Sequence, residues 1–166
     1  MNFIEGLKGM KFRTIICDDN ELVRDIYYHI LFEHGHEVYS FGDAQYCPLN
    51  AIFDSDCNNV TPCSDILISD VSMPQVNGLD FVENLHAKGC KIEHIALISG
   101  YWADEDISRA KQLGCSVFHK PMELKDLCEW LAKCEANVNP QRVLSDKYAN
   151  FFYLKKGLKL KGAVLH

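Results

Sequence analysis

Residues 66–78 read ILISDVSMPQVNG, an apolar run that ends in a carboxylate and then breaks into a loop with proline and glycine. A short, continuous apolar run is typical of a strand that is buried on both faces of a sheet. Asp70 is the last residue of the run, so we expect its side chain at the edge of a sheet. The stretch therefore predicts a buried parallel strand that presents a carboxylate at its carboxyl end.

Three further apolar runs also end in polar side chains. These runs and their polar ends are residues 11–17 with Asp18 and Asp19, residues 92–98 with Ser99, and residues 115–119 with Lys120. The carboxyl ends of parallel strands lie along one edge of a sheet, and ligands of such sheets bind at that edge. We therefore expect these polar groups to converge with Asp70 in one crevice.

Helical patterns alternate with the strand patterns along the chain. Apolar residues three and four positions apart predict helices over residues 20–34, 104–113 and 122–134, with a weaker helix over 43–53 that Pro48 disturbs. A further helix is predicted after Gly78, with Leu79, Val82 and Leu85 inward. A short second strand is predicted over residues 37–41. This alternation predicts an α/β fold with a doubly wound, five-stranded parallel sheet and helices on both faces.

The 166 residues suffice for one domain, which we assign to residues 11–135, after a lead over 1–10. Residues 136–166 form a basic, aromatic C-terminal extension with a net charge of +5, whereas the first 135 residues carry −11. We expect a small hairpin or a packed arm there. An acidic body does not suit direct binding of nucleic acid.

The chain also carries signals of its compartment. No apolar stretch approaches the roughly 20 residues of a membrane helix, and no secretion signal is recognisable. The eight cysteines include no C-x-x-C pair, which argues against a ribbon-type zinc site, and they suit reduced thiols. We expect a cytoplasmic protein without membrane contact. His34 and His36 are expected to form a surface pair.

The predicted crevice has a distinctive charge. Two unit charges about 4 Å apart interact by about 4 kcal/mol at an effective dielectric near 20, so Asp18, Asp19 and Asp70 would repel one another. Lys120 offsets one charge, and a divalent cation with oxygen ligands would offset two more. Mg²⁺ fits best, because it binds a few carboxylates, keeps waters and coordinates phosphate oxygens.

Asp70 then has the chemistry of a nucleophile. A carboxylate with a reference pKa near 3.9 is ionised at neutral pH and needs no general base. Its attack on a phosphorus atom gives an aspartyl phosphate, and catalysis is mostly positioning and neutralisation of charge. Lys120 would hold phosphoryl oxygens, and the Ser99 hydroxyl would donate a hydrogen bond to one.

These motifs, taken together and in order, resemble the receiver domain of bacterial two-component response regulators. They are Asp18-Asp19, Asp70-x-x-Met73-Pro74-x-x-x-Gly78, Ser99-Gly100 and Lys120-Pro121. The resemblance covers residues 11 to about 134. It implies a flavodoxin-like strand order of 2-1-3-4-5 and a phosphoryl group accepted by Asp70 from a phosphohistidine of a sensor kinase or phosphotransfer protein.

The resemblance also implies the roles of the other site residues. Mg²⁺ would be held by Asp19, Asp70 and the backbone carbonyl of Ser72, with Asp18 assisting through water, while Ser99 and Lys120 would sense the phosphoryl group. Val117 stands where members of the family often carry Tyr or Phe. Tyr101 and Trp102, just after Ser99, could serve as a bulky exposed readout.

The sequence therefore predicts a stand-alone receiver that is not an enzyme and signals through contacts with an unknown protein target. Its oligomeric state stays open, a homodimer included. One alternative is an interaction module that keeps the fold without phosphorylation. Another is a Mg²⁺-dependent phosphatase with an aspartyl nucleophile, but enzymes of the haloacid dehalogenase type have Asp-x-Asp where this chain has Asp18-Asp19-Asn20.

Overall fold

The computed structural model of the chain describes residues 12–50, 57 and 60–146. Five strands form one parallel sheet: β1 (Phe12–Cys17), β2 (His36–Phe41), β3 (Ile66–Asp70), β4 (His94–Ser99) and β5 (Ser116–His119). The strand order is β2-β1-β3-β4-β5, and every neighbouring pair runs parallel. The predicted flavodoxin-like α/β fold and its strand order are thus confirmed.

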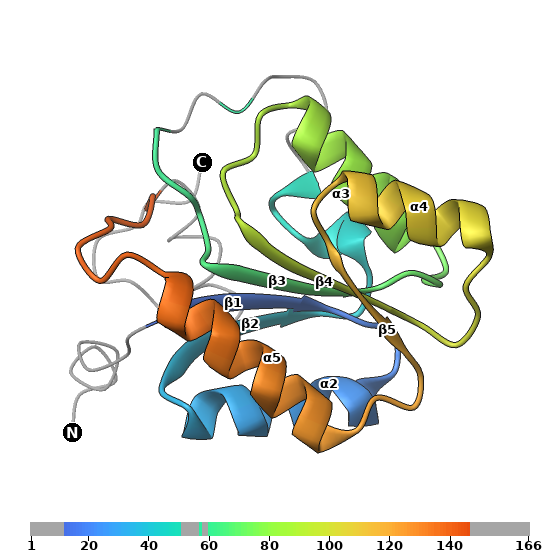
Figure 1. Cartoon of the computed structure of the whole chain (residues 1–166), viewed down its shortest axis with the longest axis horizontal. Helices are drawn as coiled ribbons and strands as arrows, with labels where there is room; N and C mark the ends of the chain where they lie inside the picture. Colours follow the sequence, from blue (N-terminus) through green and yellow to red (C-terminus); the bar gives the residue numbers. More distant parts are fainter. Residues whose placement is uncertain (1–11, 51–56, 58–59, 147–166) are drawn as a thin grey trace, which may run out of the picture.

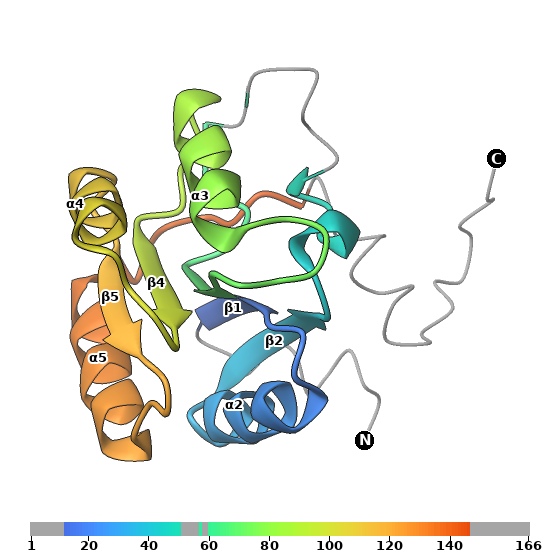
Figure 2. The ribbon, with the colours of Figure 1, turned by 90° about the vertical axis from the view of Figure 1, so that its right-hand side faces the viewer.

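Four α-helices cover the sheet: α2 (Glu21–Glu33), α3 (Gly78–Ala87), α4 (Asp104–Gln112) and α5 (Leu124–Asn137). Helices α2 and α5 lie on one face, and α3 and α4 lie on the other (Figure 1). The view turned by 90° shows the same division into three layers (Figure 2). None of these helices is long and apolar enough to cross a lipid bilayer.

Each face of the sheet has its own core. On one side, residues such as Ile15, Leu67 and Leu97 pack with the apolar positions of α3 and α4. On the other side, residues such as Ile16 and Ile68 pack with α2 and α5. Successive side chains of a strand point to opposite faces, so one apolar run supplies both cores.

Side-chain caps set where two of the helices begin. The Asn20 side chain accepts hydrogen bonds from the amides of Leu22 and Val23 at the start of α2, as its position predicts. Asn77 does the same at the start of α3. Helix α2 ends before Gly35, whose φ of 82° lies in the left-handed region that glycine adopts at little cost.

The helix predicted over residues 43–53 is wrong for its described part. Residues 44–46 form only a short 3₁₀-helix, η1 (Ala44–Tyr46), which the Asp43 side chain caps through the Gln45 amide. Pro48 follows at once and has no amide hydrogen to donate, so a longer helix is disfavoured. Residues 51–56 lie outside the described residues.

Three further expectations need correction. His36 is fully buried rather than part of a surface pair, with Nδ1 2.8 Å from the Thr14 hydroxyl and Nε2 2.8 Å from Glu135 Oε1. Ile26 of α2 and Leu124 of α5 are 48% and 53% exposed, although their spacing suggested an apolar helix face. Helical spacing identifies one face but not how far a neighbouring element covers it.

The described start of the C-terminal extension packs against the body. Arg142 donates two hydrogen bonds to the Asp65 carboxylate, at 2.7 and 2.6 Å, and the Ser145 amide donates to the Pro62 carbonyl at 2.8 Å. The lead over 1–10 and residues 147–166, where a small hairpin or a packed arm is expected, lie outside the described residues.

Candidate phosphoacceptor site

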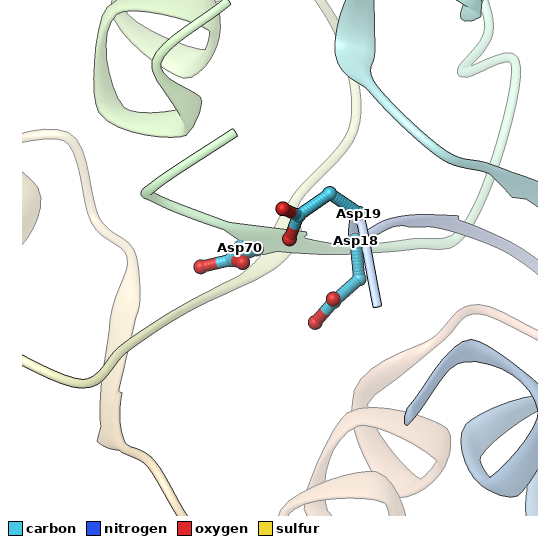
Figure 3. Close-up of side chains that lie close together, drawn as sticks. All are labelled: Asp18, Asp19 and Asp70. Carbon is cyan, nitrogen blue, oxygen red and sulfur yellow. The ribbon is translucent and has the colours of Figure 1, made fainter. Parts of the chain in front are cut away.

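Asp18, Asp19 and Asp70 form an acidic cluster at the carboxyl edge of the sheet. Carboxylate oxygens of the three residues lie within 4.8 Å of one another (Figure 3). The register explains why they meet, because Cys17 at the end of β1 pairs with Ser69 of β3, and the next residue on each strand is an aspartate. Asp18 and Asp70 are 1% and 4% exposed, whereas Asp19 is exposed.

Lys120 provides positive charge to this cluster. It directly follows β5, and its Nζ lies 2.8 Å from Asp70 Oδ2 and 3.2 Å from Asp18 Oδ2. The Lys120 amide also donates to the Ser99 carbonyl at 2.8 Å, which ties the end of β5 to the end of β4. The structure therefore brings together the predicted polar ends of β1, β3 and β5.

The environment shifts the pKa values of both partners. Burial raises the pKa of the Asp70 carboxyl above its ordinary value, and the charge of Asp18 adds to this, while the hydrogen bond from Lys120 opposes it. Burial by itself would lower the pKa of Lys120, but its hydrogen bond to Asp70 and the charge of Asp18 raise it overall. Lys120 is therefore charged at neutral pH and offsets the charge of one of the three carboxylates.

The loop after β3 holds Asp70 in place. The Ser72 amide donates a hydrogen bond to Asp70 Oδ1 at 3.1 Å, so the loop that follows Asp70 orients its side chain. Gly78 begins α3 so close to Asp70 that a Cβ on it would clash with the Asp70 carbonyl oxygen. Glycine at this position lets the loop fold back over the end of its own strand.

Ser99 is at the predicted strand end but makes other contacts. Its hydroxyl donates to the Tyr101 carbonyl at 2.7 Å and accepts from the Tyr101 amide at 3.3 Å. Within the described part of the chain, no hydrogen bond joins Ser99 to Asp70. The Ser99 side chain is thus held against the loop after β4 rather than directed to the carboxylate.

Of the two aromatic residues considered as an exposed readout, only Tyr101 is exposed. Tyr101 is 81% exposed, as expected, but Trp102 is buried and its indole Nε1 donates to the Phe118 carbonyl at 2.8 Å. Val117 packs against the core on the α3 and α4 side, and Phe118 packs against the opposite core with Trp130. Phe118, one position after Val117, thus points to the other side of β5.

Two residues near the cluster were missed from the sequence. Burial raises the pKa of the Tyr27 phenol on α2, and the charge of Asp18 adds to this while the charge of Lys120 opposes it, so Tyr27 lies near the site. Asp43, after β2, accepts a hydrogen bond from the Gln75 amide at 2.8 Å and so anchors the loop that follows Asp70. Both contacts join distant parts of the chain, and no local pattern marks them.

The donor set fits a divalent cation that prefers oxygen ligands. Three carboxylates and one ammonium leave two negative charges in excess, and Asp18 and Asp70 bear theirs in a buried setting. Mg²⁺ is typically bound by one or two carboxylates together with waters and phosphate oxygens. The residues present are therefore suited to hold Mg²⁺ beside the Asp70 carboxylate.

The response regulator receiver domain family matches residues 14–132, which is most of the chain. This protein belongs to that family. The strand order and the placement of Asp70 at the end of β3 agree with the membership. The receiver domain is the phosphoacceptor of two-component signalling, so the fold and the general class of function predicted from the sequence are confirmed.

Curated relatives share the receiver region but are longer proteins. A probable transcriptional regulatory protein of Picosynechococcus is 29% identical over 135 residues, covering 81% of this chain and 52% of the relative. The sensory/regulatory protein RpfC of Xanthomonas campestris is 29% identical over 124 residues, covering 72% of this chain and 16% of RpfC. The chain therefore spans about half or less of these relatives.

Solved structures of receivers superpose on the described fold. The N-terminal domain of an uncharacterized protein from Wolinella succinogenes is 25% identical, with a TM-score of 0.63, and covers 75% of this chain and 94% of that domain. The chemotaxis protein CheY4 of Vibrio cholerae is 23% identical, with a TM-score of 0.59, and covers 74% and 98%. The likeness to CheY4 supports the fold alone.

Proposed function

We propose that this receiver domain accepts a phosphoryl group on Asp70 from a phosphohistidine donor and signals through protein contacts. One observation carries the proposal: the buried Asp70 carboxylate lies 2.8 Å from the Lys120 ammonium and within 4.8 Å of the Asp18 and Asp19 carboxylates. This arrangement suits an anionic nucleophile whose product carries more negative charge. We expect the protein to be located in the cytoplasm.

Phosphoryl transfer follows from the positions of the side chains. An oxygen of Asp70 attacks the phosphorus atom, and the bond from phosphorus to the imidazole nitrogen of the donor breaks as the electron pair leaves with the imidazole. Lys120 stays within reach of the new phosphoryl oxygens and offsets their charge. Asp19, Asp70 and the Ser72 carbonyl, with Asp18 assisting through water, would hold Mg²⁺, which would supply further neutralisation when bound.

Phosphorylation of Asp70 would change the conformation of the loop after β4. The Ser99 hydroxyl donates to the Tyr101 carbonyl, and a phosphoryl group on Asp70 would offer it a charged acceptor instead. Charge-assisted hydrogen bonds are roughly twice as strong as neutral ones. Release of Tyr101 would then change an exposed surface, and the ratio of the two states would follow their difference in affinity for the phosphoryl group.

An apolar groove next to the site suits a protein donor. It has a volume of about 450 Å³ and is lined by Val23, Ile26, Tyr27, Lys120, Pro121, Met122 and Leu124. The exposed side chains of Ile26 and Leu124 lie on its walls, which accounts for apolar surface that the body leaves uncovered. A sensor kinase or phosphotransfer protein docked there would hold its phosphohistidine beside Lys120.

Incubation with acetyl phosphate and Mg²⁺ tests the proposal. Intact-mass spectrometry should show the mass of one added phosphoryl group, sensitive to hydroxylamine, in wild type and in an Asp126→Asn control. Asp70→Asn should show none. Absence of an adduct on the folded wild type would favour a phosphorylation-independent interaction module, and turnover of generic phosphate esters would favour a phosphatase.

A further inference from the structure

A cluster of cysteines surrounds a small cavity at the opposite edge of the sheet from Asp70. The cavity has a volume of about 20 Å³ and is lined by Leu49, Cys57, Thr61, Cys63, Leu85, Lys88, Cys90 and Lys91. A cavity of this size has room for about one water molecule. Three thiol side chains therefore share a small space between the β2–β3 connection and the α3–β4 connection.

The main chain brings Cys57 next to the two residues that precede Cys90. The Cys57 amide donates to the Lys88 carbonyl at 2.7 Å, and a Cβ placed on Gly89 would lie 3.9 Å from the Cys57 carbonyl oxygen. Cys57 thus runs alongside residues 88–89, and Cys90 follows directly. Cys57 and Cys90 also line the same cavity of about 20 Å³, so the two side chains border one small space.

Accessibility separates this pair from the neighbouring thiols. Cys57 and Cys90 are partly exposed and are not in a disulfide, whereas Cys47 and Cys63 are buried. Among the described residues, the acidic cluster at Asp70 is the one group of three or more His, Cys, Asp or Glu whose ligand atoms lie within 4.8 Å. The thiols are therefore not arranged as a preformed metal site, and a two-cysteine reaction suits them better.

We propose that Cys57 and Cys90 are a redox pair that closes a reversible intramolecular disulfide on reaction with a small disulfide oxidant such as oxidised glutathione. The Cys57 thiolate attacks one sulfur of the oxidant, whose S–S bond breaks, and one glutathione leaves. The Cys90 sulfur then attacks the Cys57 sulfur of the mixed disulfide, and its proton leaves with the second glutathione. The protein loses two hydrogens, which the oxidant gains.

The surroundings decide the order of these two steps. Burial raises the pKa of the Cys90 thiol to about 11, so this thiol is protonated at neutral pH. The thiolate is the attacking species in disulfide exchange, which favours Cys57 as the first nucleophile and Cys90 as the resolving thiol. Lys88 and Lys91 line the same cavity and would attract an anionic oxidant such as oxidised glutathione.

The experiment equilibrates the folded full chain with a series of ratios of reduced to oxidised glutathione. Mass spectrometry after acid quenching should show a loss of two hydrogens, and peptide mapping should place the disulfide between Cys57 and Cys90. Cys57→Ser should block the reaction, whereas Cys90→Ser should stop it at the mixed disulfide. Cys128→Ser is the matched control, because Cys128 is a partly exposed cysteine of α5.

Two results would overturn the pair. One is a fully reduced protein at every ratio of glutathione while exposed control thiols react. The other is a disulfide that maps to different cysteines, or that forms only after a denaturant is added. Acetyl phosphate labelling of Asp70 should be the same in the oxidised and reduced forms, so the outcome is independent of the proposed phosphoacceptor function.

Discussion

Lys120 Nζ lies 2.8 Å from Asp70 Oδ2, although fifty positions separate the two residues in the chain. The same ammonium lies 3.2 Å from Asp18 Oδ2, so one cation serves two buried carboxylates from two different strands. The carboxylates of this site therefore leave an excess of negative charge at the edge of the sheet. Its response to pH, to divalent cations and to substitution follows from that imbalance.

Lys120→Met should destabilise the protein and slow phosphorylation of Asp70. Removal of the ammonium leaves Asp18 and Asp70 buried without their shared partner, which should lower the free energy of unfolding by about 1–3 kcal/mol. Urea unfolding without divalent cation measures this change. Lys125→Met is the matched control, since Lys125 pairs with Glu129 at the exposed surface of α5, and an equal loss there would refute the explanation.

Mg²⁺ should stabilise the wild type, and Asp19→Asn should weaken that effect. A ligand that binds only the folded state adds about 2.7 kcal/mol at 100 times its Kd. The variant should be slightly more stable than wild type without Mg²⁺, because one repulsive charge is gone. Thermal unfolding across a Mg²⁺ titration tests both parts, and an unchanged Mg²⁺ response in the variant would count against the assigned ligand set.

Asp70 should reduce stability at neutral pH in the absence of a cation. Its pKa in the folded protein is raised above the ordinary 3.8 by burial, so the folded state holds this proton to higher pH than the unfolded state. The contribution of Asp70 to stability therefore falls as pH rises through the folded-state pKa. Asp70→Asn should exceed wild type in stability at neutral pH.

The difference between Asp70→Asn and wild type should shrink as the pH is lowered toward the ordinary pKa of an aspartate. Urea unfolding at a series of pH values provides the measurement, with Asp126→Asn as the control for the loss of one exposed carboxylate. Saturating Mg²⁺ should reverse the order of the two proteins at neutral pH. A wild type that is the more stable without Mg²⁺ would contradict the assigned shift.

Gly78→Ala should destabilise the protein even though alanine favours helices. A Cβ at this position would clash with the Asp70 carbonyl oxygen, and overpacking of this kind costs about 1–3 kcal/mol. Gly100→Ala is a matched control, because a Cβ there meets no atom within 4 Å. Chemical unfolding of the two variants should separate them, and equal stabilities would show that the loop after β3 moves away at little cost.

Ile26→Ser should slow phosphoryl transfer from a phosphohistidine protein but not from acetyl phosphate. Ile26 lines the apolar groove beside Lys120, and only a protein donor needs that surface. The ratio of the two rates, measured with a histidine kinase that phosphorylates the wild type, reports docking apart from chemistry. Val143→Ser, at another exposed apolar residue, should leave the ratio unchanged. A parallel loss of both rates would point to damage to the site itself.

The sequence by itself determined the sheet, because each apolar run is long enough for a strand and ends at a polar residue or a turn. Asp70 and Lys120 could be assigned to strand ends from their own neighbours, and right-handed crossovers between parallel strands then bring those ends to one edge. The caps by Asn20 and Asn77 are equally local, since the acceptor and its donors lie within three residues.

Only the tertiary structure decided which groups contact one another. The burial of His36 depends on Glu135 of α5, the anchoring of the Asp70 loop depends on Asp43, and the hydrogen bond of Trp102 depends on β5. The same holds for the meeting of Cys57 with residues 88–90, which two separate connections bring together. The spacing of apolar residues indicates which face of a helix or strand is apolar. A contact between distant segments depends instead on how the helices pack against the sheet.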